Sequence, residues 1–221
     1  MLGKCNLDEY EKLCYNFKKI TMKNNIMEDF EMSMKEAFDI YFTKLNEVWQ
    51  ENHRAYPKTF YLKRRDVKDV YVPGTIDEEG YVQWQPKLQT EAVDFELIER
   101  ELGITIHSHL KEYFSTYWFM QLSGYVGENS YSFDNVYPNA VISELIKKSR
   151  EEGNIDYMQG IFFAIGDANQ DCGLYVNNDN GEVICVDWDL ARHYDFKIPF
   201  DEVSFKVADS MAELIKKLEV R

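Results

Sequence analysis

The segment GIFFAIGDANQDCGLYVNNDNGEVICVDW, residues Gly160–Trp188, places a cluster of strands in the C-terminal half of this 221-residue chain. It begins with an apolar run, Gly160–Ile165, and continues with two stretches of alternating apolar and polar residues, Cys172–Asn177 and Glu182–Trp188. The turn-forming residues Asn178–Gly181 separate these two stretches, which is typical of a β-hairpin. We therefore predict consecutive strands here, joined by short turns.

Helical patterns flank this strand cluster on both sides. Apolar residues recur at helical spacing in several segments, and the helices predicted from them are Leu7–Ile20, Met27–Asn52, Thr90–Leu102, Ser108–Leu122, one from Pro138 to near Arg150, and a last one after Asp209 or Ser210. Further strands are expected at Tyr81–Pro86 and within Gly124–Phe133. Helices around consecutive strands indicate an α+β fold with a mostly antiparallel sheet of about five to six strands. We assign residues 1–33 to a helical N-terminal extension and residues 34–221 to a single domain.

The charge of the chain bears on its partners. Its formal net charge is −14 and its pI is about 4.8, which argues against nucleic acids and against anionic membrane surfaces, because both require a basic patch. Residues 167–202 contain nine acidic and two basic residues, a net charge of −7. We expect the hairpin to gather this charge on one side of the sheet and to attract a basic protein. The alternative is that the charge only keeps the protein dispersed in solution.

The location of the protein is inferred from its cysteines and its apolar segments. The four cysteines lack metal-type spacing, and the chain has neither a signal-type N-terminus nor a run of about 18 apolar residues. We predict a cytoplasmic protein with reduced thiols and without insertion into the membrane.

The acidic segment between Gly166 and Gly181 invites comparison with a calcium loop. An EF-hand loop that started at Asp167 would place Cys172 where a glycine is obligatory and Asn178 where a bidentate glutamate is required. A loop that started at Asn177 fails in the same way. We therefore predict no calcium site, and the sequence indicates no other cofactor.

Histidine and cysteine offer no stronger catalytic set. His107 and His109 stand two residues apart and have no third zinc ligand at a suitable spacing. Cys172 and Cys185 fall on the two predicted hairpin strands, where a metal or redox pair is conceivable, but buried structural thiols are the favoured interpretation.

Carboxylates leave one enzymatic alternative open. Asp187 and Asp189 lie two residues apart on a predicted strand and would face the same side of it. Together with Asp167 and Asp171 they could form a metal-dependent hydrolase site. An acidic surface without catalytic function is the favoured interpretation.

The run Tyr81–Pro86, YVQWQP, resembles the Trp-Gln-Pro strand of the SecY-interacting Syd family. In that family the strand follows an N-terminal helix that ends in a tryptophan with a proline nearby, as Trp49 and Pro57 are placed here.

Two later stretches extend the resemblance over about residues 36–220. Ile104–Phe114 is similar to the segment that enters the second core helix of Syd proteins, and Phe162–Ala164 followed by Asn180–Val183 is similar to their final hairpin. More broadly, Ile165–Ile184 resembles the SUKH superfamily, to which Syd belongs and whose members place an acidic, glycine-rich turn between two core strands. The chain departs from Syd in its N-terminal extension and in a first loop built around Lys63-Arg64-Arg65.

The resemblance implies a non-enzymatic α+β binding protein. Syd proteins bind basic cytoplasmic loops of the SecY translocon channel through an acidic concave face, and many other SUKH proteins resemble immunity proteins of bacterial toxin systems. Our leading expectation is a Syd-like immunity protein that neutralises a cognate toxin, expected to be a nuclease, by binding it. The alternative is a quality-control protein that binds SecY at the inner face of the cell membrane. In both cases carboxylates with two tryptophan anchors are expected to contact the basic partner, and the predicted residues are Trp84, Glu128, Asp134, Asp167, Asp171, Asp179, Glu182, Asp187, Trp188 and Asp189.

Overall fold

The computed structural model describes residues 32–62, 69–137, 141–153, 156–169 and 172–221. Met32–Arg221 form one compact unit. The helix predicted at Leu7–Ile20, the basic cluster Lys63-Arg64-Arg65 and the predicted helix start at Pro138 lie outside the described residues. Within those residues, no helix is both long enough and apolar enough to cross a bilayer.

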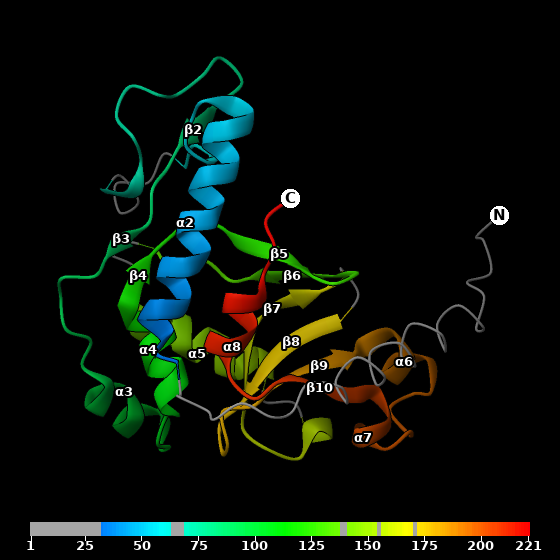
Figure 1. The fold of residues 1–221 in the computed structure, drawn as a ribbon. Helices are drawn as coiled ribbons and strands as arrows, with labels where there is room; N and C mark the ends of the chain where they lie inside the picture. Colours follow the sequence, from blue (N-terminus) through cyan, green and yellow to red (C-terminus); the bar gives the residue numbers. More distant parts are fainter. Residues whose placement is uncertain (1–31, 63–68, 138–140, 154–155, 170–171) are drawn as a thin grey trace. The chain divides into compact units, whose positions relative to one another are not determined.

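Runs of strands are interspersed with helices along the chain, as Figure 1 shows. The helices are α2 (Met34–His53), α3 (Phe95–Leu102), α4 (Ser108–Thr116), α5 (Ile142–Gly153), α6 (Trp188–His193), α7 (Phe200–Val203) and α8 (Met211–Lys217), with a short 3-10 helix, η2 (Asp156–Met158). The strands are β1 (Lys58–Phe60), β2 (Tyr81–Gln83), β3 (Lys87–Leu88), β4 (Tyr117–Trp118), β5 (Leu122–Val126), β6 (Asn129–Phe133), β7 (Phe162–Ala168), β8 (Cys172–Asn177), β9 (Val183–Asp187) and β10 (Ser204–Ala208).

A six-stranded antiparallel sheet forms the centre of the fold, in the order β10-β9-β8-β7-β6-β5. Each strand pairs with its neighbours along the chain, so the sheet is a meander. The pairs β1–β2 and β3–β4 form two small sheets of their own. The prediction of an α+β fold with a mostly antiparallel sheet is confirmed.

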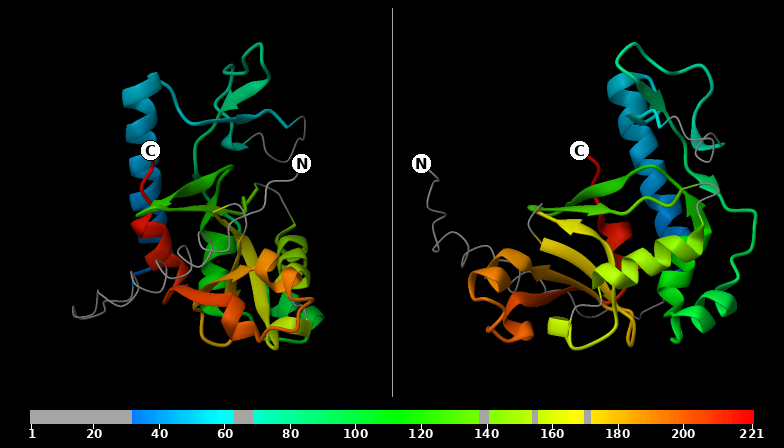
Figure 2. Two further views of the ribbon diagram at one scale, coloured as in Figure 1. Left: turned by 90° about the vertical axis from the view of Figure 1, so that its right-hand side faces the viewer. Right: turned by 180° about the vertical axis from the view of Figure 1, so that it is seen from behind.

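Helices pack on both faces of the six-stranded sheet. Helices α2 and α8 lie on the near side of it in Figure 1, and α5 lies on the far side, which the right-hand view of Figure 2 shows in front. On the near side the aromatic ring of Phe38 packs against Tyr113 and Phe119 at centroid distances of 5.9 and 5.5 Å. On the far side a smaller apolar cluster surrounds Phe162 and Tyr175. This cluster and α5 do not extend over β5, β6 and the end of β7, where polar side chains line the surface of the sheet instead.

Several helix boundaries differ from prediction for local reasons. Helix α2 begins at Met34, later than expected, because Ser33 and Glu36 form a capping box. Helix α3 begins after Asp94, whose carboxylate accepts a hydrogen bond from the Leu97 N–H, and not after Thr90. Its predicted end at Gly103 is confirmed, since Gly103 adopts a left-handed conformation with φ of 67°.

The segment predicted as one helix from Ser108 to Leu122 is helical only as far as Thr116. From Tyr117 onward it forms β4, which pairs with β3, and Leu122 begins β5. Aromatic residues fit a pleated strand as well as they fit the buried stripe of a helix, and the available strand partners decide between the two here. Strand β10, which no pattern in the sequence predicted, pairs with β9.

The free edge of β5 is closed by contacts from two other parts of the chain. The Tyr41 hydroxyl donates a hydrogen bond to the Ser123 carbonyl oxygen (2.8 Å) and accepts one from the Ser123 N–H (2.9 Å). The Tyr125 and Glu219 backbones exchange two further hydrogen bonds of 2.9 and 2.8 Å. The outward backbone groups of this edge are therefore occupied, which is one way in which proteins prevent unwanted strand pairing.

Replacing Tyr41 with phenylalanine is expected to lower the free energy of unfolding by about 1–3 kcal/mol, because the Ser123 N–H and carbonyl lose their shared partner. Denaturant-induced unfolding measures this loss. The matched control is Tyr194→Phe, since Tyr194 is 45% exposed and its hydroxyl makes no hydrogen bond to any described residue. Equal losses in both variants would contradict the role given to Tyr41.

Candidate functional site

An irregularity in β7 decides which side chains the exposed part of the sheet carries. Ala164 pairs with Tyr175 and Gly166 pairs with Leu174, so β7 advances by two residues where β8 advances by one. This β-bulge shifts the side-chain alternation of β7 by one position. Asp167 consequently lies on the same face as Ala164, although strict alternation would place the two on opposite faces.

Gly166 makes this bulge possible. Its φ of 145° is a backbone conformation that other L-residues rarely adopt. A Cβ atom at this position would collide with the backbone carbonyl oxygen of Ser132 on the neighbouring strand. The close approach of β6 and β7 therefore requires a glycine here.

Two carboxylates with raised pKa values stand on the face that the bulge creates. Asp134 directly follows β6, and its N–H donates to the Ile165 carbonyl oxygen of β7, so it lies beside Asp167. Loss of surrounding water is the largest cause of the raised pKa of Asp134; Lys148 opposes it, and Glu152 and Asp167 add to it. Loss of water, followed by repulsion from Glu152, also raises the pKa of Asp167.

The negative charge of these carboxylates is incompletely balanced. Glu152 forms an exposed ion pair with Lys148 at 3.4 Å, but neither Asp134 nor Asp167 has an ion-pair partner within the described part of the chain. A cation that approached them would lower the repulsion among the three acidic groups.

A pocket of about 430 Å³ adjoins these carboxylates between α5 and α6. Three acidic and three aromatic residues contribute to its lining, namely Asp134, Glu152, Asp167, Tyr175, Trp188 and Phe196. The Trp188 Nε1–H donates to the Tyr175 hydroxyl at 2.9 Å. A Cβ atom on Gly173 would lie 2.8 Å from Trp188 Nε1, so the missing side chain of Gly173 leaves the space that the indole occupies.

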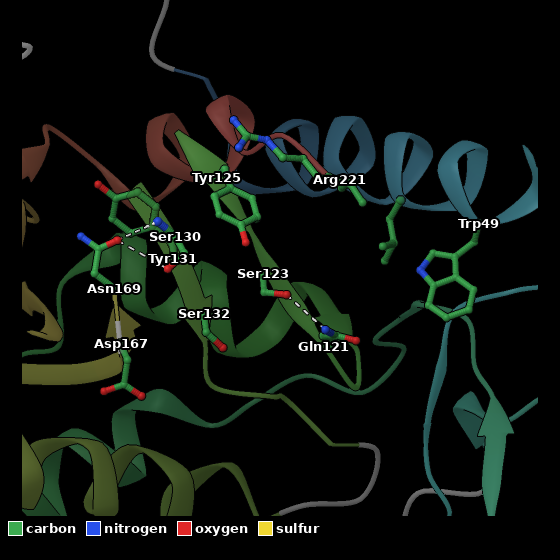
Figure 3. Close-up of a pocket in the computed structure, with 13 residues that line it drawn as sticks. Trp49, Gln121, Ser123, Tyr125, Ser130, Tyr131, Ser132, Asp167, Asn169 and Arg221 are labelled. Atoms are coloured by element: carbon green, nitrogen blue, oxygen red, sulfur yellow. Dashed lines mark hydrogen bonds between the residues drawn. The ribbon is translucent and has the colours of Figure 1, made fainter. Parts of the chain in front are cut away.

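A second pocket, of about 600 Å³, continues the hollow across β6 and β5. Figure 3 shows Asp167 on one side of it and Tyr125 with Arg221 on another. The Arg221 guanidinium carbon lies 4.4 Å from the centroid of the Tyr125 ring, a cation–π contact. Ser132 pairs across the strands with both Asp167 and Ser123, and this row forms the floor of the pocket. Because Asp167 lines both pockets, we call the two together the open face.

The open face brings together three residues of the predicted partner-binding set, namely Asp134, Asp167 and Trp188. Asp134 and Asp167 come from neighbouring strands, and half-buried Trp188 comes from the first position of α6. Glu152 of α5 and Phe196 after α6 complete the site and were missed by the sequence analysis. The sequence gives a signal for the location of the face but not for these two residues: Gly166 allows the close approach of β6, and Gly173 leaves room for the Trp188 indole.

Other members of the predicted set lie at the surface away from the open face. Glu128 is exposed in the β5–β6 turn and Asp179 in the β8–β9 turn. Glu182 pairs with Lys206 at 2.5 Å, and Asp189 pairs with Arg192 at 2.8 Å. We had expected the charge of residues 167–202 to gather on one side of the sheet, and this expectation is wrong.

Two predicted contact residues need correction, and a third lies outside the described residues. Trp84 is 0% exposed and packs edge-on against Phe42 of α2, so it belongs to the core and offers no surface to a partner. Asp187 is 3% exposed and accepts a hydrogen bond from the Leu190 N–H as the N-cap of α6. Asp171 is the residue that is not described.

The same region bears on the hydrolase alternative. Strand β9 ends at Asp187 and α6 begins at Trp188, so Asp187 and Asp189 do not share one side of a strand. In the part of the chain that the structure describes, no three His, Cys, Asp or Glu residues are grouped so that they could hold a metal ion. Cys185 is fully buried, and burial raises the pKa of its thiol well above the usual range.

The chain is similar to known proteins both as a member of a family and in its individual sequence. The family model described as Syd protein (SUKH-2) matches residues 35–193, a span that includes every residue named above for the pocket between α5 and α6 except Phe196. Protein Syd of Shewanella halifaxensis (strain HAW-EB4) is 24% identical over 199 residues, which cover 86% of this chain and 84% of that protein.

Substituting alanine for Gly166 is expected to lower the free energy of unfolding by about 3 kcal/mol or more, because the methyl group meets backbone that cannot move aside. Gly127→Ala is the matched control: Gly127 also has a positive φ, 63°, but no atom lies within 4 Å of its missing Cβ. Strain alone is expected to cost the control about 1–2 kcal/mol. Denaturant titration compares the two variants, and a loss at Gly166 no larger than at Gly127 would rule out the steric requirement.

Replacing Asp134 or Asp167 with asparagine is expected to raise the free energy of unfolding slightly at pH 7, by about 0.5 kcal/mol or less after solvent screening. The raised pKa values mean that ionisation of these carboxylates opposes folding, so wild-type protein loses stability as the pH rises through them. The advantage of the variants should vanish below about pH 3.9, where these carboxyl groups are protonated even in the unfolded chain. Asp179→Asn, in the exposed hairpin turn, is the control, and a loss of stability at pH 7 in the first two variants would contradict this account.

Proposed function

The chain belongs to the Syd (SUKH-2) family, and we propose that it is a non-enzymatic protein-binding module whose open face receives basic cytoplasmic loops of SecY. In this proposal it acts in the cytoplasm, peripherally at the inner face of the cell membrane. The family assignment supports SecY as the partner, because the Syd resemblance implies SecY binding.

The observation that carries the proposal is the placement of Asp134 and Asp167 side by side with raised pKa values and without ion-pair partners among the described residues. If these carboxylates served only the fold, pairing them with a cation of the chain would make the protein more stable. A binding surface instead needs negative charge that a partner can still neutralise. Opposite charge also speeds encounter, and this gain weakens as ionic strength rises.

Toxin immunity remains the second hypothesis. An acidic, partly aromatic face suits a basic toxin domain as well as a basic channel loop, so the geometry alone favours neither partner. The match to the family named for Syd favours SecY, and neutralisation of a toxin stays a prediction. A metal-dependent hydrolase is disfavoured by the positions of Asp187 and Asp189.

The proposal predicts that Asp134→Lys combined with Asp167→Lys abolishes co-purification of SecY from detergent-solubilised membranes. Two cations would then face the basic loops, and a loss of at least about tenfold in affinity is expected. The matched control is Glu78→Lys combined with Glu79→Lys, which changes the net charge equally in an exposed turn before β2 and should leave recovery of SecY intact.

Two outcomes would contradict the proposal, the first its binding site and the second its partner. Unchanged recovery by the Asp134 and Asp167 double variant would remove the open face as the binding site. Failure of the wild-type protein to recover SecY, together with protection of cells against the toxin encoded beside its gene, would establish the immunity hypothesis instead.

A further inference from the structure

The pocket between α5 and α6 combines features that suit one kind of side chain. The carboxylates of Asp134 and Asp167 lie at one side of it, and the rings of Trp188 and Phe196 form other parts of its wall. Phe196 is 46% exposed, so its ring is accessible to an occupant of the pocket. The pocket therefore offers negative charge and aromatic surface to the same occupant.

We propose that this pocket binds an arginine side chain of the basic partner and discriminates it from lysine. The inference rests on the proposed function and specifies what the open face recognises. A guanidinium group is planar, stacks on aromatic rings and donates hydrogen bonds in several directions within its plane. An ammonium group carries the same charge but cannot stack, and it holds its water more tightly.

The geometry of the wall fits the planar group. The Trp188 indole is fixed by its hydrogen bond to the Tyr175 hydroxyl and stands at 80° to the Tyr175 ring. Gly173 has no side chain, so the Trp188 indole lies close to the strand, with Nε1 2.8 Å from where a Cβ atom would be. An arginine side chain inserted between Trp188 and Asp167 could stack on the indole and pair with the carboxylate at the same time.

Two arginines among the described residues line the open face, and neither forms an ion pair with Asp134 or Asp167. Arg192 lines the pocket, but it is bound to Asp189 at 2.8 Å and its side chain is 63% exposed. At the other end of the open face, Arg221 stacks on Tyr125 at 4.4 Å. That contact is an example, within this chain, of a guanidinium group lying on an aromatic ring of the same face.

The test uses a peptide that copies a basic cytoplasmic loop of SecY and a second peptide in which every arginine is replaced by lysine. Both peptides have the same charge, so titration calorimetry with the full chain isolates the contribution of the guanidinium group. The arginine peptide is expected to bind about five- to tenfold more tightly. Its binding should shift the indole Nε1–H resonance of Trp188, which is assigned by comparison with Trp188→Phe.

Variants at the pocket wall locate the discrimination. Trp188→Leu should reduce the affinity for the arginine peptide to that for the lysine peptide. Phe196→Leu should reduce the preference partly, and because Phe196 is 46% exposed, this variant keeps the test valid if Trp188→Leu fails to fold. Phe60→Leu, which removes an aromatic ring that is 60% exposed on β1, should leave the preference unchanged.

The two proposals fail in different ways. Equal binding of the arginine and lysine peptides would overturn the arginine pocket and leave the proposed function intact. An arginine preference that survives both Trp188→Leu and Phe196→Leu would place the recognition elsewhere. No binding of either peptide, with no recovery of SecY, would overturn both proposals.

Discussion

The close contact between β6 and β7 at Gly166 is the constraint on which the open face depends. Because this residue has no side chain, β7 can accommodate a β-bulge of one extra residue and still pair with both β6 and β8. Before the bulge, β7 contributes apolar side chains to both faces of the sheet and holds the helices on each side. After the bulge, the same strand presents Asp167 next to Asp134. One residue thus separates the part of the strand that packs under the helices from the part that lines the open face.

Much of the fold could be predicted from the sequence, because alternation and turn chemistry act locally. The β8–β9 hairpin follows from its apolar pattern and its Asn-rich turn, and the last helix follows from Ser210 and its apolar stripe. The bulge could not be predicted in this way, because it depends on how near β6 lies to Gly166. Strict alternation from the start of β7 would have placed Asp167 on the face that carries Ile165, which is 0% exposed. The burial of Trp84 could not be predicted either. The short strand β2 that precedes it does not reveal that Phe42 of α2 packs against the Trp84 ring.

Net charge was a poor guide to where carboxylates without ion-pair partners lie. Within residues 167–202, one carboxylate caps a helix, and three others pair with nearby cations. Asp134 and Glu152, which contribute to the open face, lie outside that segment. A total over a stretch of sequence counts every charge equally, whereas the field at a surface depends on which charges are already neutralised by neighbours. The distribution of ion pairs, which only the folded chain reveals, therefore shows which carboxylates are left without a charged partner among the described residues.

The occupied edge of β5 also limits how a partner can be held. Many proteins capture an extended peptide by letting it join a sheet as an additional strand, so that affinity comes from backbone hydrogen bonds that every sequence can form. At this edge Tyr41 and the segment around Glu219 have taken those positions. In the proposed complex, a loop at the neighbouring open face would therefore be recognised by its side chains. Such a complex distinguishes one loop sequence from another, and it can dissociate without a ladder of main-chain bonds having to be broken.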